Sequence, residues 1–205
     1  MEINYPDITF EGPAISDQNF LNALPEDLKS ILKKKNGFIA FGGGFHLRGI
    51  CDEPTWHSLE LFWTGNHSFS KLYSSVQKDD VPFGQDCLGD QFLLRKNQVL
   101  RLRGESGEIV NMKMDFLTFL EEALSNPLEF LELSPLKKIQ NEGKKLEPGQ
   151  LINVYPPFIT AESRKGVSLK PIPTLERILF LSNFAKQISN ISNGTQIKFN
   201  VASND

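Results

Sequence analysis

The first regular pattern of apolar and polar positions in the chain is helical. Leu28, Ile31 and Leu32 lie at positions i, i+3 and i+4, so they form one apolar stripe on a helix. Pro25 suits the first helical position, and Gly37 suits the left-handed conformation that often ends a helix. The pattern therefore predicts an amphipathic helix that begins near Pro25 and ends before Gly37.

Strand patterns follow in the middle of the chain. Two apolar runs, residues 91–95 and 98–102, flank the two-residue connection Lys96-Asn97, which predicts a tight antiparallel hairpin. Residues 38–41 and 45–50 predict two more strands on either side of three consecutive glycines. Further expected elements are a short helix after residue 17, a turn over residues 104–107, a helix over residues 116–124 and a helix break at residues 126–127.

The last third of the chain predicts an extension of the same folded unit. Residues 137–149 are polar and Lys-rich, and we expect a linker there. A strand over residues 151–154 and a helix from about Thr174 are expected beyond it. Ile197, Phe199 and Val201 alternate with polar residues, which predicts a final strand with one dry face. We therefore expect a core over residues 1–139 and an extension over residues 140–205 that packs on it.

Composition and charge restrict the classes of function. The 205 residues are 40% hydrophobic and 23% charged, as in an ordinary globular protein, and the net charge is −3. A basic excess, typical of proteins that bind nucleic acid directly, is not present. The sequence has neither an export signal pattern nor an apolar stretch of membrane-spanning length. We expect a cytoplasmic protein without a membrane or nucleic-acid partner, with Cys51 and Cys87 as free thiols.

Three motifs that invite a chemical interpretation lack the context that the chemistry requires. The glycines at 42–44 precede a strand-like segment, whereas a phosphate-binding loop leads into a helix. His46, His57 and His67 have spacings that match no local metal motif, so we expect three unrelated histidines. Residues 104–107 are one residue short of a nucleophile elbow. The sequence thus predicts no catalytic residues, no metal and no cofactor.

Paired carboxylates are the best candidates for contact with a partner. Glu121 and Glu122 are adjacent on a predicted helix and are expected to form a solvated flank. Asp86 and Asp90 bracket a turn that contains glycine, where local hydrogen bonds are expected. Loop carboxylates also serve binding, and clustered acidic charge favours association with a basic partner. The candidate partner-binding residues are Asp79, Asp80, Asp86, Asp90, Glu121 and Glu122.

The motifs in their order resemble a known family. The helix that starts at Leu24-Pro25-Glu26-Asp27-Leu28 and leads to Asn36-Gly37 resembles the opening of the SUKH superfamily. The segment from Val81 to Phe92 is similar to that family's central block, and residues 99–102, 107–108 and 116–120 continue the order. The similarity covers roughly residues 17–133. Within this range the triple glycine and the Trp56 to Trp63 region depart from the family pattern, and residues 140–205 extend beyond the family core.

The resemblance implies a fold and a class of function. The implied fold is α+β, a twisted and mainly antiparallel sheet with packed helices. The family includes the fungal regulator of cell-wall glucan synthesis and many bacterial toxin-immunity proteins, and it offers no catalytic residue set to transfer. We therefore expect an immunity protein that neutralises a polymorphic toxin by occlusion. The alternatives are a regulatory interaction scaffold without a toxin partner and an enzyme whose site is assembled only in space.

Overall fold

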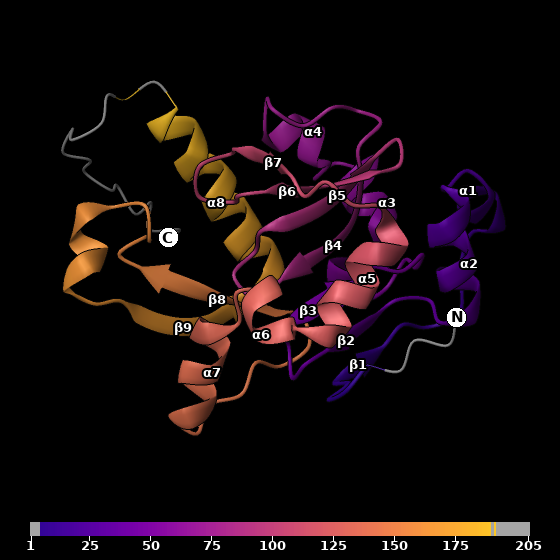
Figure 1. The fold of residues 1–205 in the computed structure, drawn as a ribbon. Coiled ribbons are helices and arrows are strands. Elements are labelled where there is room, and N and C mark those ends of the chain that lie inside the picture. The colour runs from indigo at the N-terminus through magenta and orange to yellow at the C-terminus, as the bar shows by residue number, and fades with distance from the viewer. Residues whose placement is uncertain (1–4, 190, 192–205) are drawn as a thin grey trace.

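The computed structural model describes residues 5–189 and 191. Its main feature is a seven-stranded sheet in which the strands are neighbours in chain order and every pair is antiparallel (Figure 1). The strands are β1 (Phe10–Glu11), β2 (Phe38–Ala40), β3 (Phe45–Leu47), β4 (Val81–Asp86), β5 (Gln91–Arg95), β6 (Gln98–Leu102) and β7 (Ile109–Asn111). This architecture confirms the α+β fold class with a mainly antiparallel sheet.

Two hairpins of the sheet follow directly from local sequence. The β5–β6 hairpin is confirmed: Arg95 pairs with Gln98, and Lys96 in the connection has a φ of 55°. The glycine run forms the turn between β2 and β3, where the N–H groups of Gly43 and Gly44 donate to the carbonyl oxygen of Ala40. These N–H groups are used inside the hairpin, as expected for a turn and not for a phosphate-binding loop.

Helices cover both faces of the sheet, which explains why β5 is apolar on both sides. Phe92 packs in the main core, which α2 (Glu26–Lys34) and α5 (Phe116–Ser125) help to build. Leu93 points to the opposite face, toward a second core formed with the helices α3 (Leu59–Trp63), α4 (Phe69–Leu72) and α8 (Thr174–Ile188). The remaining helical segments are α1 (Gln18–Asn22), η1 (Thr55–His57), α6 (Pro127–Phe130), α7 (Ser134–Asn141) and η2 (Ala161–Lys165).

The C-terminal part packs on the same sheet in the described residues. Strands β8 (Gln150–Tyr155) and β9 (Ser168–Pro173) form a separate antiparallel hairpin. The N–H of Ile152 donates to the carbonyl oxygen of Cys87 at 2.8 Å, and the Ile152 side chain is fully buried in the main core. Helix α8 then packs between the hairpin and the main sheet and adds Ile178 and Ala185 to the second core (Figure 1). The predicted strand around Ile197 to Val201 lies outside the described residues.

One sequence-based prediction in this region is wrong in part. The expected linker over residues 137–149 begins inside α7, so only its second half is irregular. Leu136 and Ile139 are buried at helical spacing and anchor α7 on the core. The lysines on the exposed side of α7 give the segment the polar composition of a linker, which explains the error. Within the described residues, none of the helices combines the length and the apolar character needed to cross a membrane.

Candidate functional site

A hollow of about 880 Å³ lies at the end of the sheet where β4 passes into β5. Its walls come from that turn, from the turn between β6 and β7, from α6 and the start of α7, and from α8 with the segment that follows β8. The volume is in the range of ligand-binding clefts, and the lining mixes apolar side chains with a few charged ones. The hollow is therefore the best candidate site in the described residues.

A largely buried ion-pair network centred on Arg101 adjoins the hollow through Asp90 and Glu132, which line it. The Arg101 guanidinium lies 2.8 Å from Asp86 Oδ2, 3.0 Å from Asp90 Oδ2 and 3.0 Å from Glu132 Oε1. Arg103 adds contacts to Asp90 at 3.1 Å and to Glu132 at 2.8 Å. Arg101 lies on β6 and Arg103 follows its last residue, and both side chains reach Asp90 and Glu132. The charged side chains of this network thus hold one another in position.

The Asp86 side chain is buried inside the turn between β4 and β5 and stabilises it. One carboxylate oxygen accepts hydrogen bonds from the N–H groups of Leu88, Gly89 and Asp90, which confirms the expected local turn bonds. The side chain is fully buried, so the interpretation of Asp86 as a direct partner contact is wrong for this structure. Burial and the neighbouring Asp90 raise the pKa of Asp86 to about 7, against the opposing effect of Arg101.

One wall of the hollow is held in place by Glu105, in the turn between β6 and β7. Its carboxylate accepts hydrogen bonds from the backbone N–H of Phe158 at 3.1 Å and of Ile159 at 3.0 Å. Burial raises the pKa of Glu105. Arg177 of α8 lies 3.8 Å away and donates to the Leu88 carbonyl and to Asn153. The carboxylate therefore joins the extension to the sheet at the edge of the hollow.

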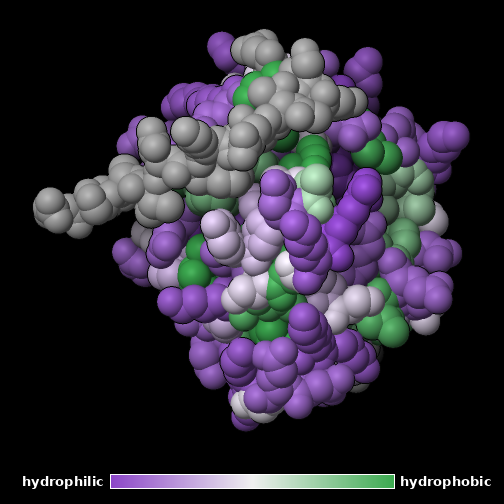
Figure 2. Space-filling view, turned by 90° about the vertical axis from the view of Figure 1, so that its left-hand side faces the viewer, coloured by the Kyte–Doolittle hydropathy of each residue, from purple (hydrophilic) through white to green (hydrophobic). Residues whose placement is uncertain are grey.

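The rim of the hollow is apolar. Leu128, Phe158 and Ile159 are 42%, 45% and 53% exposed, although all three are large hydrophobic residues. Figure 2 looks onto the side of the molecule that carries β8, β9 and α7, where apolar side chains form separate areas among hydrophilic ones. Large apolar side chains grouped at one hollow and surrounded by polar residues are typical of interaction sites.

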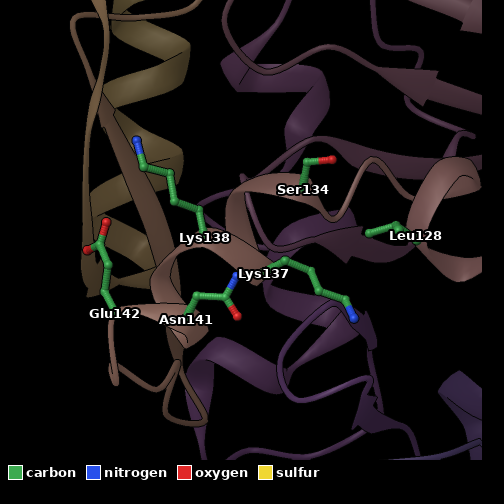
Figure 3. Close-up of a pocket in the computed structure, with 6 residues that line it drawn as sticks. All are labelled: Leu128, Ser134, Lys137, Lys138, Asn141 and Glu142. Atoms are coloured by element: carbon green, nitrogen blue, oxygen red, sulfur yellow. The ribbon is translucent and has the colours of Figure 1, made fainter.

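A shallower pocket of about 500 Å³ adjoins the hollow on the outer side of α6 and α7. Figure 3 shows its six lining side chains, five of which project from α7 and its C-terminal end. Leu128 and Ser134 line both depressions, whereas Lys137 and Lys138 line only the shallow one. The surface around Leu128 therefore separates an acidic hollow from a basic pocket.

The other predicted carboxylates are not part of the hollow. Asp80 is buried, and both of its oxygens bond to Arg95 at 2.7 and 2.8 Å, so its interpretation as a direct contact is also wrong for this structure. Asp79 is exposed at the same end of β4, roughly 20 Å of strand away from Asp86. Glu121 and Glu122 are exposed on α5, as expected for a solvated flank. The structure brings only Asp86 and Asp90 together.

Two of the three histidines form a buried pair, which corrects the expectation that they are unrelated. His46 Nε2 lies 2.8 Å from His57 Nδ1, and His57 Nε2 lies 2.9 Å from the carbonyl oxygen of Asn36. The carbonyl only accepts, so His57 Nε2 donates to it, and His46 Nε2 must donate to His57 Nδ1. Both rings are then neutral. Burial lowers the pKa of His57 to about 4 and that of His46 well below its ordinary value.

The histidine pair continues into a buried arginine. Gln85 joins His46 Nδ1 to the guanidinium of Arg48, which is fully buried and also donates to Gln91 and to the Pro82 carbonyl. These hydrogen-bond acceptors are neutral, and burial lowers the pKa of Arg48 to about 9. The described residues contain no group of three or more side chains placed to hold a metal. This buried network ties β3, β4 and β5 to η1 and to Asn36, the residue that accepts from His57.

Both cysteines are free and buried, which confirms the expected thiols. Burial raises the pKa of Cys51 to about 11 and raises that of Cys87 well above its ordinary value, with the Asp86 charge adding to the effect at Cys87. A thiol with a raised pKa is a weak nucleophile at neutral pH. Cys87 therefore serves as packing in the main core beneath the turn.

Sequence reasoning missed the arginines and the far wall of the hollow. Arg101 and Arg103 were open to recognition, because the Arg-x-Arg pattern at the end of β6 lies beside the start of β5, which the Asp86 turn precedes, in the predicted hairpin. The contact between Glu105 and Ile159 spans 54 residues and has no local signal. The residues that complete the hollow therefore depend on tertiary packing.

Comparison with known proteins establishes the fold but not the family. Neither protein-family models nor curated proteins match the sequence. The crystal structure of Atu4351 from Agrobacterium tumefaciens is similar in fold, with a TM-score of 0.51 and 12% identity over 85% of each chain. At this identity the likeness is one of fold alone. The chain thus shares its fold, over 85% of its length, with a protein of known structure.

Proposed function

We propose that this chain is a cytoplasmic, non-enzymatic binding protein, and specifically an immunity protein that neutralises a toxin by occluding it. The observation that carries the proposal is the hollow with its exposed apolar rim of Leu128, Phe158 and Ile159. Exposure of large apolar side chains to water is unfavourable in free energy, and binding of a protein partner would bury them. The resemblance of residues 17–133 to the SUKH superfamily favours a toxin as the partner.

The charges at the hollow also suit binding better than catalysis. Asp86, Asp90 and Glu132 bond to arginines or backbone N–H groups, and this network gives the surface a fixed shape. A fixed surface loses little conformational entropy when a partner binds. The exposed carboxylates Asp79, Glu121 and Glu122 lie elsewhere on the surface and provide additional acidic charge for steering.

Co-expression with the product of an adjacent gene tests the proposal, because an immunity protein is expected beside its toxin. The toxin candidate alone should stop growth of the host cell, and this chain should restore growth and bind the product in a 1:1 mixture of purified proteins. Binding without rescue would favour the regulatory scaffold. Rescue without any detectable complex would contradict occlusion and favour a hidden activity.

A further inference from the structure

We propose that the hollow receives a basic side chain and an adjoining apolar side chain from a single segment of the protein partner. The inference rests on the proposed binding function and specifies the partner's chemistry. It follows from three properties of the hollow: its charge, its apolar rim and the way in which one wall is held.

Charge complementarity favours a cation. Four carboxylates but only two guanidinium groups, those of Arg103 and Arg177, line the hollow. Arg103 is held by Glu132 and Asp90, and Arg177 by Leu88, Asn153 and Glu105, so both guanidinium groups are already bonded. An incoming anion would compete with these internal bonds for the two guanidinium groups. A cation would instead be attracted by the excess of carboxylates.

Glu129 is the carboxylate best placed to receive the cation. It lies on α6 at the rim, is exposed, and accepts a hydrogen bond from the Asn126 side chain at 3.0 Å. Within the described part of the chain, it forms no ion pair. A guanidinium or ammonium group from a partner can therefore pair with Glu129 without displacing an arginine of this chain.

The apolar half of the ligand is set by the opposite wall. Phe158 and Ile159 are exposed on a segment whose two N–H groups are bonded to Glu105, and Leu128 of α6 lines the same hollow. Because these side chains are already positioned, an apolar group that enters between them buries surface at a small ordering cost. A partner segment with a basic residue next to an apolar one can therefore pair with Glu129 and bury the apolar rim at the same time.

Titration of the full chain with short peptides, followed by backbone and methyl NMR, tests the inference. The probe is N-acetyl-leucyl-arginine amide, added to about 20 mM because a dipeptide is expected to bind in the millimolar range. Its citrulline counterpart keeps the shape without the charge, and free arginine lacks the apolar neighbour. We expect the arginine dipeptide to shift the signals of Leu128, Phe158 and Ile159, and both comparison compounds to bind at least several-fold more weakly.

Two variants, each with a matched control, locate the effect. Glu129→Gln should weaken the dipeptide about threefold, whereas Glu60→Gln, an exposed change on α3 outside the lining of the hollow, should leave its affinity unchanged. Ile159→Ser should weaken it by a similar factor, whereas Val110→Ser, an exposed change on β7 outside the lining of the hollow, should not. Thermal unfolding of each variant shows that the fold is retained.

Several outcomes would overturn the inference. Equal binding of the citrulline dipeptide would remove the role of charge, and equal binding of free arginine would indicate a small-molecule site instead of a docking surface. Shifts elsewhere, or no shifts, would remove the site. The adjacent-gene product separates this inference from the proposed function: if it binds the chain and the Glu129 and Ile159 variants bind it normally, the proposed function stands and this inference falls.

Discussion

The carboxylate of Glu105 accepts a hydrogen bond from the backbone N–H of Ile159 at 3.0 Å. The two residues are separated by 54 positions, and the contact fixes the segment after β8 against the turn between β6 and β7. Through this contact the C-terminal extension forms one wall of the hollow, and the core forms the other walls. The candidate site therefore exists only when both parts of the chain are present.

Glu105→Ala is expected to loosen this wall without unfolding the protein. The change removes the acceptor of two N–H groups, at a cost of about 1–2 kcal/mol of local stability. Amide exchange at Phe158 and Ile159 should accelerate by about tenfold, while exchange in β5 stays slow. Glu108→Ala, an exposed change in the same turn, is the control and should leave both rates unchanged. Equal exchange in the two variants would show that Glu105 does not hold the segment.

Arg101→Leu is expected to be strongly destabilising. The change leaves the buried Asp86 carboxylate without its cation, which costs about 3–5 kcal/mol in comparable buried pairs. Chemical denaturation should show this loss at pH 8 and a smaller one at pH 5, because protonated Asp86 carries no charge to leave unpaired. Arg164→Leu, an exposed change in η2, should alter stability by less than about 0.5 kcal/mol. A loss as small as that of the control would contradict the role given to Arg101.

The buried histidine pair predicts a loss of stability on acidification. Burial lowers the pKa of His57 to about 4 in the folded protein, so the folded state binds a proton less readily than the unfolded state does. The contribution of this pKa difference to the free energy of unfolding is fully present above pH 6.5, the ordinary histidine pKa. It is lost as the pH falls toward 4. The expected loss from this residue between pH 7 and pH 4.5 is about 2 kcal/mol.

Variants isolate this effect from the other groups that titrate in the same range. His57→Gln should be less stable than the parent at pH 7, and its unfolding free energy should fall less steeply between pH 7 and pH 4.5. His67→Gln changes a histidine outside the pair and should keep the parental slope. If the unfolding free energies of the parent and of His57→Gln fall equally steeply between pH 7 and pH 4.5, protonation of His57 does not cause the loss of stability, and the prediction is wrong.

A chain that ends at residue 140 is expected to be unstable or insoluble. It lacks apolar side chains that are buried in the main core, namely Leu146, Ile152, Val154 and Leu169. Each fully buried side chain of this kind contributes about 1.5–3 kcal/mol. Light scattering and thermal unfolding measure the outcome. If the shortened chain unfolds as cooperatively and at as high a temperature as the full chain, the extension is a separate module.

Local signals account for the parts of the fold that sequence predicted correctly. The β5–β6 hairpin has two apolar runs and a two-residue connection, and α2 has an apolar stripe with suitable ends. Strand β9 was not predicted, because Pro171 and Pro173 cannot donate to a sheet and disfavour strands. They are tolerated here because β9 pairs with β8 alone in a two-stranded hairpin, which leaves the other side of β9 as an edge.

The candidate site was predicted only where its residues lie close together in the chain. The turn from Asp86 to Asp90 combines carboxylates with a glycine, and its local hydrogen bonds were expected from that pattern. Burial of Asp86 and Asp80 depends on Arg101 and Arg95 from neighbouring strands, so an acidic pair in the sequence does not reveal whether it is exposed. The apolar rim comes from two segments that only the folded chain brings together.

The most direct test of the central claim is the affinity of the full chain for the adjacent-gene product, measured by calorimetry. The account predicts a tight 1:1 complex that weakens at least tenfold when Leu128 and Ile159 are both changed to serine, since two exposed apolar contacts of the interface are lost. Val110→Ser should bind like the parent. Absence of a complex with the parent chain, or full affinity in the double variant, would contradict the account.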